Sequence, residues 1–278
     1  MGPAAPPCDA MSEPGASSIT DLCIVTAVDV EFKIAASLLS GKSFSEEPPR
    51  GRSRRMKICS GQFGGRRATI LQSGMGAVGF AEGLAKHLTN NRYDALIVSG
   101  LAGGLDPRLR VGDAVIYNLC YDERISYFTR PERLGQGEVA ATACDETLSG
   151  FLRRALSNSG LSFIQAPGIT VGRVVTEAKE KLALGARYGA AAVDMETYET
   201  LKACARLGLP AAALRVISDE AVRDIPDFNR IYNADGRMNG WRTFAAMAAR
   251  PSAALRLLMT FRPALQSLKA TLQAAMGA

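Results

Sequence analysis

Residues Ala211 to Asp219, AAALRVISD, give the clearest indication of the fold. The apolar and β-branched residues in this stretch predict a buried strand, and the carboxylate of Asp219 follows where that strand ends. Runs of the same kind alternate with helical stretches from Asp21 to Ser218. This alternation predicts an α/β fold: a single domain with a central mixed sheet flanked by helices, plus a C-terminal helical extension.

The remaining elements follow from the same patterns. Between Ser40 and Gly65 the chain is polar and basic, which predicts an exposed loop leading into a hairpin. Gly208 and Pro210 are expected to end the helix before the strand that begins at Ala211. The expected strands are 22–28, 68–73, 95–99, 114–119, 169–175, 191–195 and 211–217, and the expected helices are 31–39, 78–89, 146–158, 177–188 and 197–207.

The two ends of the chain differ from the predicted domain, which spans residues 21–235. Residues 1–20 are rich in Pro, Ala, Gly and Ser and predict a disordered leader rather than a signal peptide. Residues 236–278 carry no acidic side chain and predict a basic amphipathic tail, with helices broken at Pro251 and Pro263. The tail helix either touches a membrane interface or packs on the body with its arginines in water.

Composition argues against several classes of protein. No apolar run reaches about 18 residues, the length that a membrane-spanning helix needs, so a cytoplasmic protein is expected. A peripheral contact of the tail with the inner membrane face stays open. Six scattered cysteines and one histidine support no metal site, and no cofactor is expected. Nucleic-acid binding is not expected, because no basic patch interleaved with aromatic residues is found. His87 lies inside a predicted helix and is interpreted as structural.

Two kinds of residue follow the predicted strands where they end. Glycine-rich runs occur at 73–76 and 99–105, and carboxylates occur at Glu31, Glu196 and Asp219. Glycines let backbone amides approach a ligand, and α/β sheets bind ligands at the carboxyl ends of their strands. A single carboxylate there can simply cap a helix. Three of them at neighbouring strand ends predict a functional site.

These strings together resemble the nucleoside phosphorylase superfamily, and most closely its nucleosidase branch, which includes methylthioadenosine/S-adenosylhomocysteine nucleosidase. The resemblance implies that Glu31 activates the attacking water, that Glu196 holds the ribose hydroxyls beside Met195, and that Asp219 protonates the purine. It also implies a small-molecule purine nucleoside as ligand, an adenine-facing backbone near Val174 and Val175, and a homodimer or larger oligomer. The further implied substrate-binding residues are Met75, Gly76, Leu101, Ala102, Gly103, Val175 and Ser218.

The implied reaction explains these residue types. Cleavage of a glycosidic bond passes through an oxocarbenium-like sugar and expels a base that leaves poorly unless it is protonated, so a general acid is needed near the purine. Asp219 must then be protonated beforehand, which a partly desolvated pocket would favour. Glu31 has the opposite task of removing a proton from water, and Glu196 places negative charge near the developing cation.

Departures from the family pattern leave the substrate open. Nucleosidases usually carry a serine where this chain has Leu101, and the arginine that precedes this run in phosphorylases is missing, which favours water over phosphate. Arginines between Arg50 and Arg55 could still form a phosphate site. Leu101 and the tail also resemble the hopanoid-biosynthesis branch, which implies adenosylhopane, a lipid-linked nucleoside, as substrate. The alternatives are a phosphate-dependent purine nucleoside phosphorylase and a catalytically silent nucleoside-binding module.

Overall fold

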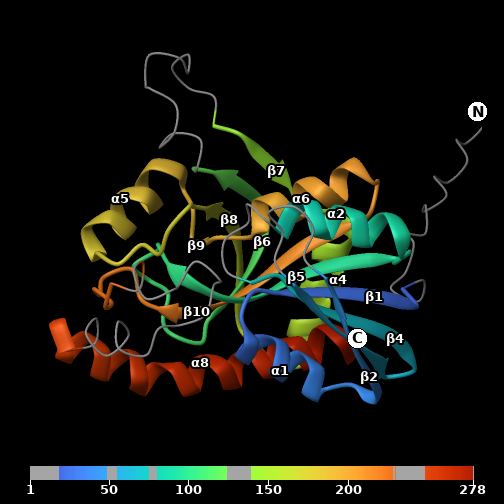
Figure 1. The fold of residues 1–278 in the computed structure, drawn as a ribbon. Helices are drawn as coiled ribbons and strands as arrows, with labels where there is room; N and C mark the ends of the chain where they lie inside the picture. The colour runs from blue at the N-terminus through green and yellow to red at the C-terminus, as the bar shows by residue number, and fades with distance from the viewer. Residues whose placement is uncertain are drawn as a thin grey trace, which may run out of the picture.

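The computed structural model describes residues 19–48, 55–74, 80–123, 139–227, 229 and 248–277. It confirms the predicted α/β fold, in which a mixed sheet lies between helices (Figure 1). The elements are, in chain order, β1 (Asp21–Thr26), α1 (Asp29–Ser37), β2 (Ser40–Glu47), β3 (Met56–Phe63), β4 (Arg66–Gln72), α2 (Phe80–Asn90), β5 (Ala95–Gly104), β6 (Ala114–Asp122), β7 (Ala141–Ala143), α4 (Glu146–Asn158), β8 (Phe163–Thr170), α5 (Ala178–Tyr188), β9 (Ala192–Asp194), α6 (Thr197–Arg206), β10 (Ala211–Asp219) and α8 (Pro251–Gly277).

The sheet is built around β5. Within the described residues it has 10 strands, in the order β10-β6-β8-β9-β5-β1-β4-β3-β2, with β7 paired to β6. Because β5 also pairs with β10, the strands β5, β10, β6, β8 and β9 close into a ring, and β1, β4, β3 and β2 extend from it. The carboxyl end of β5 therefore meets β10 on one side and β9 on the other.

Helices cover both faces of the sheet (Figure 1). Helices α1, α4 and α8 pack on one face, where Leu268 and Leu272 of α8 are completely buried. Helices α2 and α6 pack on the other face through residues such as Leu84 and Leu201. Helix α5 packs beside β8 and β9 through Leu184 and forms a smaller cluster. Burial of apolar surface on both faces holds the site-bearing strand ends in place.

Two sequence-based expectations about the sheet were wrong. Most of the expected loop at 40–65 is a hairpin of β2 and β3; β2 has almost no buried residue, so it lacks the apolar alternation that would reveal an edge strand. The strand expected at 169–175 instead spans Phe163–Thr170. Its apolar pattern is interrupted by Pro167 and Gly168, which weaken a strand signal.

The expected break at Pro263 was also wrong. Pro263 lies inside the continuous helix α8, whereas Pro251 stands at the helix start, where its missing N–H removes no helical hydrogen bond. The second half of α8 packs on the body, whereas the first half exposes apolar side chains. In the part of the chain that the structure describes, no helix is long and apolar enough to cross a membrane.

Candidate active site

The carboxyl end of β5 brings the predicted carboxylates to one region. The backbone N–H of Leu101 donates to Glu31 Oε1 at 2.8 Å, whereas Asp219 of β10 pairs in register with Gly103. The contact with Glu31 needs glycine on β5, whereas the contact with Asp219 leaves ordinary van der Waals room for a Cβ. A Cβ added to Gly100 would lie 2.8 Å from Glu31 Oε1, and one added to Gly103 would lie 3.5 Å from Asp219 Oδ1. The glycine-rich run thus lies directly between these two acids.

Glu31 does more than cap a helix. Its Oε2 accepts from the backbone N–H groups of Ala27 at 2.9 Å and Val28 at 3.1 Å, which is the capping role of a carboxylate in the first turn of α1. The third bond, from Leu101 on β5, has no part in capping. Burial raises the pKa of Glu31, although these N–H groups and the charge of Arg215 oppose the rise.

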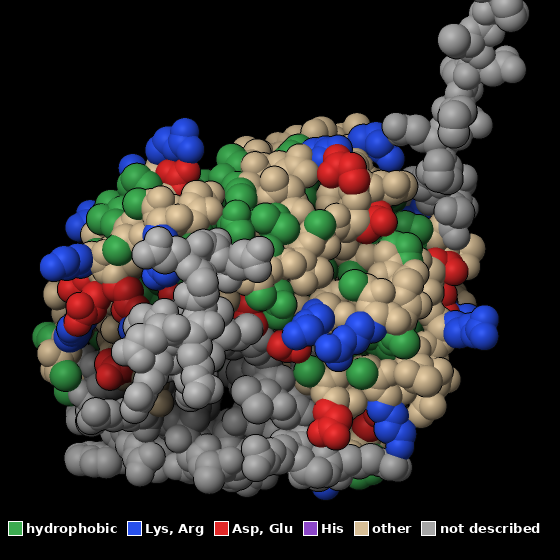
Figure 2. All heavy atoms as spheres, turned by 90° about the horizontal axis from the view of Figure 1, so that it is seen from above, with side chains coloured by type: hydrophobic (Ala, Val, Ile, Leu, Met, Phe, Trp, Pro, Cys, Tyr) green, Lys and Arg blue, Asp and Glu red, His purple; other side chains and the backbone are tan. Residues whose placement is uncertain are grey.

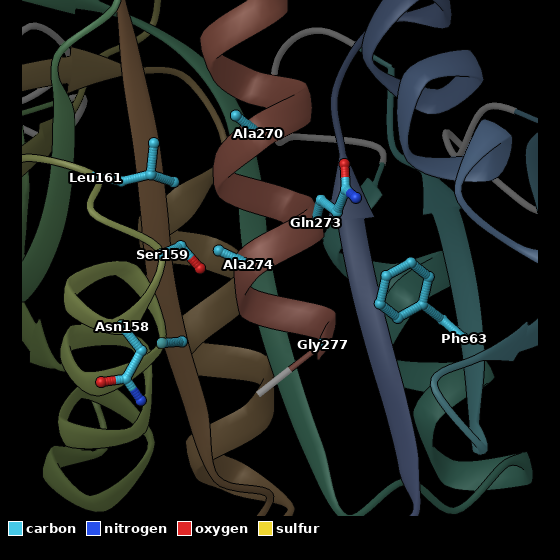
Figure 3. A pocket seen from close by; sticks show the side chains of 9 residues that line it. Phe63, Asn158, Ser159, Leu161, Ala270, Gln273, Ala274 and Gly277 are labelled. Carbon is cyan, nitrogen blue, oxygen red and sulfur yellow. The ribbon is translucent and has the colours of Figure 1, made fainter.

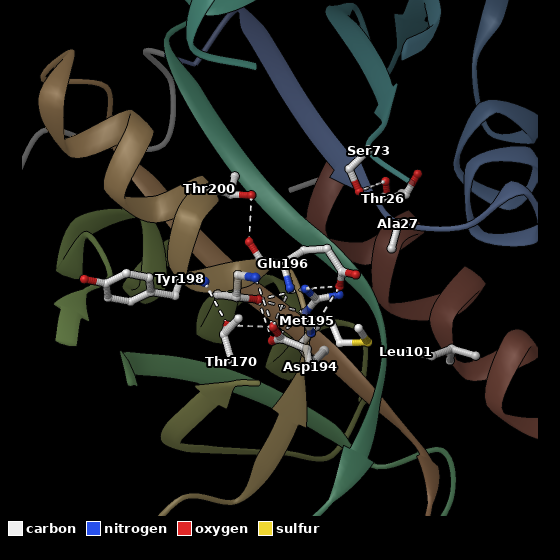
Figure 4. A network of polar contacts seen from close by, with 12 residues as sticks. Thr26, Ala27, Ser73, Leu101, Thr170, Asp194, Met195, Glu196, Tyr198 and Thr200 are labelled. Atoms are coloured by element: carbon white, nitrogen blue, oxygen red, sulfur yellow. Dashed lines mark hydrogen bonds and ion pairs between the residues drawn. The ribbon is translucent and has the colours of Figure 1, made fainter. Parts of the chain in front are cut away.

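Arg215 lies between the carboxylates of Asp194 and Glu196, which Figure 4 labels beside Thr170 and Met195. Its guanidinium is 1% exposed and lies 3.4 Å from Asp194 and 3.8 Å from Glu196, and it donates to Thr197 Oγ1 at 2.7 Å. Burial alone would lower the pKa of Arg215, but the charges of Asp194 and Glu196 outweigh it and raise this pKa. The cation therefore stays charged and holds Glu196, which is itself buried, next to Met195.

Asp194 has the structural role that a strand-end carboxylate can have. Its Oδ1 accepts from the backbone N–H groups of Glu196 at 3.0 Å and Thr197 at 2.9 Å, and from the hydroxyl of Thr170 at 2.8 Å. Its Oδ2 accepts from Thr197 Oγ1 at 2.6 Å. These bonds fix the junction between β9 and α6.

We predict that Arg215→Met destabilises the fold by about 3–5 kcal/mol, because the carboxylates of Asp194 and Glu196 would remain buried without their cation. Urea unfolding followed by circular dichroism measures this loss. Arg55→Met is the matched control, since Arg55 forms an exposed pair with Glu46 and its removal should cost less than about 1 kcal/mol. Equal losses in the two variants would contradict the structural role given to Arg215.

Asp219 is held by two neighbours. Lys181 Nζ donates to its Oδ1, and Ser218 Oγ lies 2.7 Å from its Oδ2. The Ser218 hydroxyl is also within 3.1 Å of the carbonyl oxygen of Ala102, so its one proton is shared between two acceptors. Lys181 was not predicted from the sequence as a site residue.

The remaining predicted residues lie in different surroundings. Leu101 and Gly103 are half-buried, and Ala102 is buried. Val175 is buried in the cluster of α5 and β9. The backbone N–H and carbonyl of the preceding Val174 are both bonded to the side-chain amide of Asn229, at 2.8 and 3.0 Å. The predicted site residues Met75 and Gly76 lie outside the described residues.

Other candidate features lie apart from this region. His87 contacts Glu47 at 2.7 Å and Tyr93 at 2.8 Å, on α2. A groove between the ends of α4 and α8 and Phe63 has no titratable side chain among its lining residues (Figure 3). No group of three or more His, Cys, Asp and Glu that could hold a metal ion occurs among the described residues. On the face in Figure 2, described Lys and Arg side chains are dispersed among other residue types rather than gathered in one patch.

Comparison with known proteins finds relatives in sequence and in fold. A family model described as the phosphorylase superfamily matches residues 21–253. A 5′-methylthioadenosine/S-adenosylhomocysteine nucleosidase of Mycobacterium bovis is 31% identical over 199 residues, which cover 62% of this chain and 77% of that protein.

Solved structures share the fold. The nucleosidase of the same name from Neisseria meningitidis, in complex with methylthio-immucillin-A, superposes with a TM-score of 0.70 at 19% identity and covers 93% of this chain and 99% of its own. Futalosine hydrolase of Helicobacter pylori superposes with a TM-score of 0.69 at 17% identity and covers 94% and 98%. At these identities the likeness concerns the fold.

Proposed function

The chain belongs to the phosphorylase superfamily, and from that premise we propose that it hydrolyses the N-glycosidic bond of a 5′-substituted adenosine and releases adenine. The observation that carries this proposal is the placement of Glu31, Glu196 and Asp219 around the carboxyl end of β5 and its neighbours. The nucleosidase relative at 31% identity supports hydrolysis as the class of reaction. The enzyme is thus an N-glycosidase in this proposal.

Glu31 and Glu196 act on the sugar side of the bond. Glu31 is the general base that removes a proton from the attacking water, and its elevated pKa makes it a stronger base than an ordinary glutamate. Glu196 accepts hydrogen bonds from the ribose hydroxyls and places negative charge near the oxocarbenium-like carbon. Arg215 holds Glu196 in position and is itself buried, so it is assigned no bond to the sugar.

Asp219 acts on the base side. A purine anion leaves poorly, so the acid delivers a proton to a ring nitrogen as the bond from the sugar breaks. Ser218 holds one carboxylate oxygen of Asp219, and Gly103 leaves room beside the other. The half-buried Leu101 and Met195 supply apolar contacts for the nucleoside in this proposal.

Water is the proposed nucleophile because a phosphate anion requires cationic groups that are free to bind it. Among the described residues, the buried cations near the candidate site are Arg215 and Lys181, and each is engaged by a carboxylate. Arg55 pairs with Glu46, and Arg50, Arg52 and Arg54 lie outside the described residues. A phosphate-dependent reaction remains the alternative that the assay separates.

The test is to incubate the purified protein with adenosine, methylthioadenosine and a 5′-alkyl adenosine, each with and without phosphate, and to measure free adenine. Release without phosphate supports the proposal and ranks the 5′ groups. Release only with phosphate would replace it with a phosphorylase. Binding of adenine without any release from the three nucleosides would favour the silent binding module.

We extend the proposal to a lipid-linked nucleoside such as adenosylhopane, taken from the inner membrane face. The first half of α8 exposes Leu255, Leu258 and Met259 by 59%, 58% and 67%, with exposed arginines beside them. Arg250, just before this half, lies 3.7 Å from Asp224 in the segment after β10, so the exposed helix starts near the strand end that carries Asp219. An apolar, basic helix of this kind suits an anionic lipid surface.

We therefore predict that the protein sediments with phosphatidylglycerol vesicles and remains in the supernatant with phosphatidylcholine vesicles. Replacing Leu258 and Met259 by serine should lower the bound fraction several-fold, because their apolar contact with the lipid is lost. Leu207→Ser is the control, since Leu207 is 45% exposed at the C-cap of α6. Unchanged vesicle binding of the α8 variant would contradict the proposed lipid-linked substrate. Rapid cleavage of methylthioadenosine with no turnover of the 5′-alkyl adenosine would also contradict it.

Two other sequence-based inferences stay predictions. Assembly into a homodimer or larger oligomer follows from the family resemblance, and light scattering of the purified protein checks it. The cytoplasmic location is checked by fractionation of cells that express the protein.

A further inference from the structure

Lys181 is a completely buried lysine on α5 whose ammonium group meets three oxygen atoms. Its Nζ donates to Asp219 Oδ1, to the carbonyl oxygen of Glu220 at 3.2 Å and to that of Arg223 at 3.1 Å. An ammonium has three N–H donors and no acceptor, so each proton of Lys181 has an assigned partner. Burying a lysine is unfavourable unless it is paired, and within the part of the chain that the structure describes its charged partner is Asp219.

This pairing conflicts with a simple general-acid role. A lysine ammonium against Asp219 stabilises the ionised carboxylate, whereas protonation of the purine requires a carboxyl group that carries a proton. The pair as a whole does carry that proton, because Lys181 and Asp219 share one between them in the ion-paired state.

We propose that Lys181 is a positioning residue that supplies, through Asp219, the proton received by the leaving purine. This inference rests on the proposed hydrolysis of an adenosine. A proton moves from Lys181 Nζ to the Asp219 carboxylate, and the carboxyl group passes a proton to a purine ring nitrogen. At the same time the electron pair of the sugar–base bond goes to the purine. Lys181 is then neutral.

The remaining steps restore the enzyme. Water attacks the sugar carbon and gives its proton to Glu31, so that the products are a free sugar and a neutral purine. Solvent then takes the proton from Glu31 and returns one to Lys181, which balances the cycle without an external acid. In this scheme the enzyme is active while Lys181 and Asp219 hold one proton between them. As the pH rises, activity persists until the pair loses that proton.

Other charged side chains around the pair are themselves engaged. They include the pairs Glu220 with Arg110 at 3.8 Å, Glu220 with Arg223 at 3.9 Å, Glu180 with Arg173, and Asp224 with Arg250 at 3.7 Å. Glu177, at the start of α5, lies 4.0 Å from Arg250. None of these ion pairs includes Lys181 Nζ, so the change in pH profile is assigned to the Lys181–Asp219 pair.

The experiment compares the pH dependence of kcat/KM for adenine release in the wild type, Lys181→Met and the control Lys179→Met. Lys179 is exposed on the same helix and should leave the profile unchanged. In Lys181→Met the carboxyl group of Asp219 must hold the proton alone. We expect rates close to the wild type on the acid side and an alkaline limb displaced to lower pH by about one to three units.

Other outcomes overturn the inference. An equal loss at every pH would make Lys181 merely structural, and a limb displaced to higher pH would mean that Lys181 suppresses the acid. If Lys181→Met does not fold, Lys181→Arg is the test. Arginine can hold the carboxylate of Asp219 but keeps its own proton. We therefore expect kcat to fall at least tenfold with little change in KM. Wild-type kcat in this variant would refute the inference. Absence of adenine release from the wild type would instead refute the proposed hydrolysis.

Discussion

Asp219→Asn is expected to lower kcat by about two to four orders of magnitude with little change in KM, because the variant retains the shape of the site and loses the transferable proton. The asparagine oxygen can still accept from Lys181, and its amide can donate to Ser218 in place of the present bond. The fold should therefore be preserved. Steady-state release of adenine measures both constants.

A second substrate sharpens this test. A riboside with a nitrophenolate leaving group needs no proton to depart, so Asp219→Asn should cleave it at close to the wild-type rate. Asp106→Asn is the control, since Asp106 also follows β5 but pairs with Arg108. Turnover of adenosines within about threefold of the wild type would remove Asp219 from the acid role.

The sequence predicted the fold from features that act locally. The apolar run Ala211–Ile217 became β10, and the carboxylates at strand ends came together because β5 pairs with both β10 and β9. The hairpin strand β2 was missed because almost none of its residues is buried, and hairpin pairing there is backbone bonding that leaves no apolar pattern.

The cations of the candidate site were harder to predict. Arg215 interrupts an otherwise apolar strand, which is a usable signal, since a charged residue at a buried position needs a partner. Lys181 gave no such signal, because α5 carries lysines at 179 and 181 and only the packing of the helix shows which one is buried. Its contact with Asp219 spans a sequence separation of 38 residues and depends on the tertiary fold.

Glu31→Gln is expected to lower kcat by about two to four orders of magnitude, because an amide cannot remove a proton from water. Glutamine has nearly the same volume as glutamate, but its NH₂ group is a donor. It must face either the backbone N–H of Leu101 or those of Ala27 and Val28, which are donors too. Facing Leu101 preserves more bonds and should cost about 1–3 kcal/mol of stability. Thermal unfolding of the variant checks that the loss of activity is not a loss of fold.

The pH profile separates this base from the acid. Burial raises the pKa of Glu31, so its carboxylate takes up a proton at a higher pH than an ordinary glutamate does. Since the ionised form is the base, wild-type kcat/KM should fall as the pH drops through that raised value, and Glu31→Gln should lack this acid limb. Asp29→Asn, which changes an exposed carboxylate in the same turn, should keep the limb. If Glu31→Gln also kept the acid limb, another group would be the base. The nitrophenyl riboside gives a second test, because Asp219→Asn should cleave it and Glu31→Gln should not. Loss of this cleavage in Glu31→Gln would support water activation by Glu31 independently of the leaving group.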